Sequence, residues 1–151
     1  LPRRLKGITT FCIVLNRRLN LKGFEFKKPI KAYEQLSALE NNNIYGDTFM
    51  ITEEAITHIG NNVTIVFDDM DFGTEGFKKL VLCGCSHIEN NTIHVRFQGE
   101  EGNVNQIAEF KYSEDYVERE YELSSVTGKQ QVTFIFLPGS DFDFKYFRFE
   151  R

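Results

Sequence analysis

The stretch Thr92-Ile-His-Val-Arg-Phe97 alternates apolar and polar side chains without a break. Ile93, Val95 and Phe97 fall on one face, because successive side chains of a β-strand point to opposite sides. The stretch Val117-Glu-Arg-Glu-Tyr-Glu-Leu123 alternates in the same way, with its glutamates on the polar face. This period of two predicts antiparallel strands with one buried and one solvated face.

Further strand-like runs lie on both sides of these stretches, separated by Gly, Asn and Asp. We expect strands at residues 11–15, 19–26, 49–51, 55–59, 63–67, 77–85, 106–110, 131–137 and 142–149. We expect turns at 41–43 and 45–47 and a glycine-rich loop at 98–105, whereas 30–39 has an ambiguous pattern with a helical stripe. Strands at this spacing, without intervening helices, predict an all-β sandwich or barrel.

Composition places the chain among ordinary globular domains. It has 151 residues, of which 41% are hydrophobic and 26% charged, and its formal net charge is −4 at pH 7. This length is typical of one domain. The net negative charge argues against the basic surface that nucleic-acid binding requires. No apolar run approaches the roughly 20 residues of a membrane-spanning helix. We therefore expect neither nucleic acid nor membrane as a partner.

The N-terminal residues differ from the rest in character. The chain starts with Leu1-Pro-Arg-Arg-Leu-Lys, without an initiator Met and without the apolar core of a signal peptide. We expect a fragment of a longer protein, in which residues 1–20 are a linker remnant with a candidate first strand. Residues 21–151 would then form the folded domain.

The cysteines indicate a reducing environment. Cys12, Cys83 and Cys85 fit neither a disulfide framework nor the ligand spacing of a zinc site. They are interpreted as small buried thiols, since free cysteine is among the most buried residue types. This usage favours the cytoplasm, and secretion stays open as the alternative.

No catalytic motif is present. The sequence contains no Gly-x-Ser-x-Gly elbow, no His-Glu-x-x-His pair and no phosphate-binding loop. The carboxylates, together with His87 and His94, are interpreted as solvated surface groups. Tyr45 and Tyr116 stand near Asn, Asp and Glu in predicted loops, and sugars need this combination of aromatic faces and polar partners.

The C-terminal stretch Pro138-Gly-Ser-Asp-Phe-Asp-Phe-Lys-Tyr-Phe-Arg-Phe149 resembles the closing strand of family 6 carbohydrate-binding modules. Upstream, 57–67 followed by 68–72 resembles that family's turn, hydrophobic strand and Val-Asp-Phe-like run. Residues 124–128 followed by 131–136 resemble its loop-then-strand pair. The similarity spans about residues 22 to 150.

A closer resemblance is to the C-terminal module of bacterial β-galactosidases of glycoside hydrolase family 2. It is carried by residues 23–26, 31–34, 44–47, 59–63, 70–73, 91–97 and 136–139. The resemblance implies a jelly-roll-like β-sandwich of two antiparallel sheets, of the galactose-binding-domain type. It also implies a parent hydrolase whose catalytic domain lies outside this chain.

The family's sugar site uses an aromatic pair and an Asn at one end of the sandwich. By the resemblance, the aromatic positions fall on His58 and at or near Tyr116, and the Asn position falls on Asp143. Asp141 and Tyr45 are the outer members of this predicted site. The family's usual Tyr, Trp and Asn are therefore replaced by His, Tyr and Asp, in a chain without any Trp.

The family also carries a structural calcium ion, with one acid from its first strand and one from its last. The corresponding positions here are Tyr33 and Lys145, and a lysine repels a cation that requires oxygen ligands. Glu34 and Asp143 are the candidate replacements if the register differs by a residue or two.

Two functions follow from the resemblance. The first is a non-catalytic accessory domain that tethers galactose-containing glycans near a separate catalytic domain and raises local substrate concentration. The second is an interface domain that has lost sugar binding and packs on the catalytic domain or on a neighbouring subunit. An exposed apolar patch of several hundred Å² would favour the second.

Overall fold

The computed structural model describes residues 31–151. The expected strands at 11–15 and 19–26, the expected linker and Cys12 lie outside the described residues. Helical structure in 31–151 is limited to two 3-10 turns, η1 (Lys31–Tyr33) and η2 (Ala38–Glu40). No described helix is long and apolar enough to cross a membrane.

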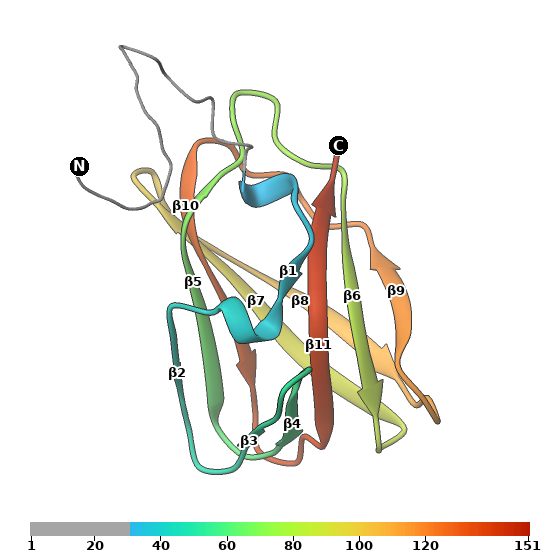
Figure 1. Cartoon of the computed structure of the whole chain (residues 1–151). Coiled ribbons are helices and arrows are strands. Elements are labelled where there is room, and N and C mark those ends of the chain that lie inside the picture. The colour runs from blue at the N-terminus through green and yellow to red at the C-terminus, as the bar shows by residue number, and fades with distance from the viewer. Residues whose placement is uncertain (1–30) are drawn as a thin grey trace, which may run out of the picture.

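Two antiparallel sheets make up the described part of the chain (Figure 1). The strands are β1 (Leu36–Ser37), β2 (Asn43–Tyr45), β3 (Met50–Ile51), β4 (Ile56–Ile59), β5 (Val63–Asp71), β6 (Lys79–Ser86), β7 (Asn90–Gly99), β8 (Gly102–Lys111), β9 (Val117–Tyr121), β10 (Lys129–Phe136) and β11 (Phe142–Glu150). One sheet has the order β3-β4-β11-β6-β9, with β1 also on β11, and the other has the order β2-β5-β10-β7-β8. The predicted all-β sandwich of two antiparallel sheets is confirmed.

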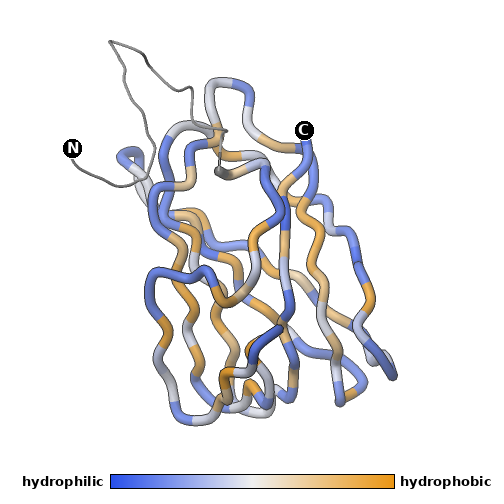
Figure 2. The backbone as a smooth tube through the Cα atoms, in the orientation of Figure 1, coloured by the Kyte–Doolittle hydropathy of each residue, from blue (hydrophilic) through white to orange (hydrophobic). Residues whose placement is uncertain are grey.

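Phenylalanine side chains fill the space between the sheets. The largest fully buried side chains include Phe67, Phe72, Phe97, Phe110, Phe134, Phe136, Phe142, Phe144, Phe147 and Phe149. Phe147 of β11 meets Phe67 of β5 with ring centroids 4.7 Å apart, and Phe134 of β10 with centroids 4.9 Å apart. Figure 2 shows the apolar segments along the strands and hydrophilic residues in many of the connections. Burial of each such ring contributes about 1.5–3 kcal/mol, which explains the chain's high Phe content.

The prediction of a loop at residues 98–105 is wrong. β7 runs to Gly99 and β8 begins at Gly102, so only Glu100 and Glu101 connect them. Gly102 has φ +121°, a conformation that favours glycine in a tight connection. The first four residues of β8 are exposed, and their polar composition therefore imitates a loop.

Two further local predictions need correction. Asn43 and Tyr45, each predicted as part of a turn, belong with Ile44 to the short edge strand β2 along β5. The ambiguous segment 30–39 contains no α-helix within its described part. Ser37 caps the second 3-10 turn: its hydroxyl accepts from the Leu39 N–H, while the Glu40 carboxylate accepts from the Ser37 N–H.

The two described cysteines lie in β6, which is buried on both faces. Cys83 and Cys85 are 5% and 4% exposed, and neither forms a disulfide. They alternate with Leu80, Leu82 and Gly84, and the two leucines belong to the core cluster. The prediction of buried free thiols is confirmed for these two residues.

Candidate functional site

Strand order places β4 and the start of β11, which carry His58 and Asp143 of the predicted site, at the lower end of the sandwich in Figure 1. β11 pairs with β4 on one side and with β6 on the other, and it begins at this end. Asp143 is the second residue of β11 and lies opposite Cys85 of β6. The pairing with β4 shifts register between Phe142 and Phe144, so Asp143 lies at an irregularity beside the end of β4.

The Asp143 carboxylate joins two segments that are distant in sequence. Its Oδ1 accepts a hydrogen bond from the backbone N–H of His58 at 2.9 Å. Its Oδ2 lies 2.8 Å from Nε2 of His87. The Asp143 side chain is 16% exposed, so both contacts are partly shielded from water. These bonds fix the orientation of the carboxylate at the site.

His58 has an uncommon backbone conformation. Its φ is +54°, in the left-handed region that costs a non-glycine residue about 1–2 kcal/mol. The hydrogen bond from its N–H to Asp143 offsets part of this cost. The exposed imidazole has its Nδ1 3.0 Å from the Thr57 hydroxyl, so the ring is held at the surface.

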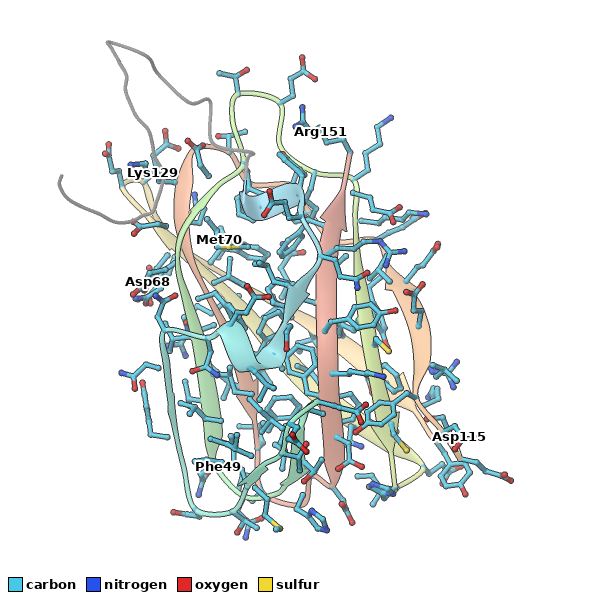
Figure 3. The ribbon with its side chains drawn as sticks, in the orientation of Figure 1. Phe49, Asp68, Met70, Asp115, Lys129 and Arg151 are labelled. Carbon is cyan, nitrogen blue, oxygen red and sulfur yellow. The ribbon has the colours of Figure 1, made fainter. Side chains whose placement is uncertain are left out.

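Tyr116 lies on the opposite side of Asp143, immediately before β9. Burial, and secondarily the Asp143 charge, raise the pKa of Tyr116 to about 12. The phenol therefore stays protonated at neutral pH and can donate a hydrogen bond. Figure 3 labels the neighbouring Asp115 at this end of the molecule.

A lysine covers part of the Tyr116 ring. Nζ of Lys145 lies 5.1 Å from the ring centroid, a cation–π distance, and 3.7 Å from a carboxylate oxygen of Glu54. A ligand that stacks on this face of Tyr116 must displace the ammonium group. A ligand on the other face could keep it in place.

Asp141 and Tyr45, the predicted outer members, differ in position. Asp141 precedes β11, and its backbone carbonyl accepts from the His87 N–H and from the Asn91 amide. Its exposed side chain therefore stands beside the site. Tyr45 is 54% exposed and pairs with Thr64 in the edge strand of the other sheet. The structure does not bring Tyr45 close to Asp143, His58 and Tyr116.

The two calcium candidates are not brought together. Glu34 precedes β1, where Leu36 pairs with Phe147, four residues beyond Asp143 on β11. Four residues of strand span about 13 Å, far beyond the distance at which two carboxylates share one ion. Lys145 pairs with Glu54, as noted above. This geometry gives no support to a calcium site formed by Glu34 and Asp143.

Sequence reasoning missed His87, Cys85 and Lys145 as neighbours of the site. His87 was interpreted as a loop residue, yet its ring contacts Asp143. The available signal was the Cys85-x-His87 spacing, which places both residues at one strand end. Their convergence with Asp143 depends on the pairing of β6 with β11, which no local pattern encodes.

The site combines exposed rings with hydrogen-bonding groups. His58 of β4 and Tyr116 of the β8–β9 connection lie on either side of β11, the strand that carries the Asp143 carboxylate. Flat C–H surfaces can rest on such rings while the carboxylate accepts from hydroxyl groups. The arrangement suits an uncharged, polyhydroxylated ligand.

No model of a protein family and no curated protein matches the chain. Solved structures do resemble it. A family 6 carbohydrate-binding module superposes with a TM-score of 0.70 at 20% identity, over 82% of this chain and 99% of that one. The family 6 module CsCBM6-3 from Clostridium stercorarium, in complex with cellobiose, superposes with a TM-score of 0.69 at 19% identity, over 80% and 95%.

The chain has the fold of a family 6 carbohydrate-binding module. The same fold occurs inside a larger enzyme. A glycoside hydrolase family 43 arabinoxylan arabinofuranohydrolase from Bacillus subtilis, in complex with cellotetraose, superposes with a TM-score of 0.64 at 22% identity. The match covers 80% of this chain and 27% of the hydrolase. The fold expected from the family 6 resemblance is confirmed.

Proposed function

We propose that this chain is a non-catalytic carbohydrate-binding accessory domain. It would tether galactose-containing glycans near the catalytic domain of a β-galactosidase-like glycoside hydrolase. His58 and Tyr116 would contact the sugar faces, and Asp143 would accept from the sugar hydroxyls.

One observation carries the proposal. Asp143 is held by the backbone of His58 on one side, and its charge reaches Tyr116 on the other. These three residues, predicted from the resemblance, lie at one end of the sandwich, and this supports the proposal because His58 and Asp143 are 85 positions apart in the sequence. The fold shared with carbohydrate-binding modules, one instance of it within a hydrolase, adds support.

A second function is favoured by a different surface. Met50 and Ile51 form the edge strand β3, next to β4, and are 55% and 61% exposed. Exposed apolar side chains on a strand edge that no other described strand covers suit packing against another protein surface. The Lys145 contact on the Tyr116 ring also reduces the face open to a sugar. An interface role on the parent enzyme or a neighbouring subunit is therefore the alternative.

Isothermal titration calorimetry separates the two functions. The ligands are galactose, lactose and galactan oligosaccharides, with cellobiose and xylose as comparison sugars. The proposal predicts weak binding of at least one galactose-containing ligand, stronger than that of the comparison sugars. Removal of one aromatic contact, by Tyr116→Ala or His58→Ala, should weaken binding by between about twofold and twelvefold, since such contacts contribute about 0.5–1.5 kcal/mol.

Tyr112→Ala is the matched control, because Tyr112 is an exposed tyrosine in the same β8–β9 connection as Tyr116, four residues before it. It should leave affinity within about twofold of the parent chain, a change below RT. Absence of heat with every sugar at millimolar concentration would contradict the proposal and favour the interface role. Binding that survives both site substitutions would place the sugar elsewhere.

A further inference from the structure

Three side chains with different metal-binding atoms converge at the N-terminal end of β11. Cys85 offers a sulfur, His87 a ring nitrogen and Asp143 a carboxylate oxygen, and these atoms all lie within 4.8 Å of one another. No other such group of three occurs in the part of the chain that the structure describes.

Strand geometry produces this convergence. Cys85 is the register partner of Asp143 across the β6–β11 pair, and directly opposed residues have Cβ atoms about 4.5–5.5 Å apart. His87 follows two residues after Cys85, where the chain leaves β6. The backbone N–H of His87 donates to the Asp141 carbonyl at 3.0 Å, which holds this segment against the start of β11.

The separations suit one small ion. Zinc takes sulfur at about 2.3 Å and nitrogen or oxygen at about 2.0–2.2 Å, so neighbouring ligands of a tetrahedral ion lie about 3.3–3.7 Å apart. The present contact between His87 Nε2 and Asp143 Oδ2 is 2.8 Å, and the largest separation in the group is within 4.8 Å. Side-chain adjustments of about 1 Å bring all three to an ion.

The surroundings already hold the Asp143 ligand in place. The second oxygen of Asp143 accepts from the His58 N–H, as outer hydrogen bonds do for metal-binding carboxylates. The Cys85 thiol donates to the Ser113 carbonyl at 3.3 Å, and this bond is given up when the thiol loses its proton to bind the ion. His87, with a side chain 45% exposed, gives the ion access from solvent.

We propose that Cys85, His87 and Asp143 bind a divalent ion of zinc type. On binding, the thiol proton of Cys85 leaves to solvent, and the thiolate and carboxylate together balance the charge of the ion. A sulfur and an imidazole among the ligands select zinc or cobalt over calcium, which takes oxygen ligands. Three protein ligands leave a fourth tetrahedral position for water or a ligand atom.

Cobalt(II) titration of the reduced, metal-free full chain tests the site directly. Bound thiolate gives cobalt a sulfur-to-metal charge-transfer absorption that oxygen and nitrogen ligands do not give. We expect this band to saturate at one equivalent and to disappear when one equivalent of zinc is added. Cys85→Ser should abolish the band, and His87→Gln or Asp143→Asn should weaken cobalt affinity at least about tenfold.

Cys83→Ser is the matched control, since Cys83 is a buried thiol two residues away on the same strand. It should retain the band and the parent affinity, with circular dichroism confirming that every variant is folded. No band at micromolar cobalt, or a band that Cys83→Ser removes and Cys85→Ser keeps, would overturn the proposal. Since no sugar is present, this result is independent of glycan binding.

Discussion

Asp143→Ala should destabilise the domain through the loss of two hydrogen-bond partners. A hydrogen bond to a charged group contributes about 1.5–3 kcal/mol when shielded from water. The bond from the His58 N–H is only partly shielded, because Asp143 is 16% exposed while His58 is exposed, so its contribution lies in the lower half of that range. The contact with the half-exposed His87 adds less, about 0.5–1 kcal/mol. We expect Asp143→Ala to cost about 2–3 kcal/mol.

The Asp143→Asn substitution distinguishes the loss of the negative charge from the loss of the hydrogen-bond acceptor. Its amide oxygen can still accept from the His58 N–H, so the expected cost is about 1 kcal/mol. Asp141→Ala is the matched control, because Asp141 makes its described hydrogen bonds through the backbone. That substitution should change stability by less than about 0.5 kcal/mol.

Urea unfolding, followed by circular dichroism and tyrosine fluorescence, measures these differences. Tyrosine is the fluorophore, since the chain has six Tyr and no Trp. The reasoning fails if Asp143→Ala lies within 0.5 kcal/mol of the parent, a change typical of an ordinary surface site. It also fails if Asp143→Asn costs as much as Asp143→Ala, because the retained acceptor would then contribute nothing.

Three further substitutions test the core, the β6–β11 contact and the acid response. Phe147→Ala should cost about 3–5 kcal/mol in urea unfolding, because this fully buried ring packs against both sheets, and a cost below 1.5 would contradict that packing. Gly84→Ala should lower the melting temperature and shift the Asp143 amide resonance, since its Cβ would lie 2.2 Å from Phe142 Cζ and 2.7 Å from the Asp143 carbonyl. An unshifted resonance would show that β11 does not move. Hydrogen bonds from Arg148 and Tyr146 hold the pKa of Glu118 below its ordinary value of 4.5. Its stabilisation is therefore present above that value and lost as pH falls through the lower, folded-state pKa. Glu118→Gln should lose less stability than the parent between about pH 5 and pH 3, and equal losses would count against the Arg148 contact.

Local alternation predicted the strands that have one buried and one solvated face. Residues 92–97 and 117–123 show it because half of each strand contacts the core, and both fall largely within observed strands. Residues 98–105 do not show this alternation, because the start of β8 is exposed on both faces. Its polar composition therefore resembles that of a loop. The length of a strand in a solvent-exposed hairpin therefore cannot be predicted from the alternation of buried and exposed residues.

The site was predictable only in part. His58, Tyr116 and Asp143 came from the resemblance, and the structure gathers them at one end of the sandwich. His87 was missed because its partner Asp143 is 56 positions away and meets it only through strand pairing. Tyr45 was included because its sequence neighbours are polar, but strand order assigns it to the opposite sheet. Pairing between distant strands is set by the whole core, so single segments do not reveal it.

The central claim is that glycans bind at the end of the sandwich that carries His58, Tyr116 and Asp143. An amide NMR titration tests this claim most directly. The chain is titrated with galactose, lactose and galactan oligosaccharides while backbone shifts are followed residue by residue. The account predicts saturable shifts clustered at His58, Tyr116 and residues 141–143. No shift at millimolar sugar, or shifts confined to another surface such as β3, would contradict it.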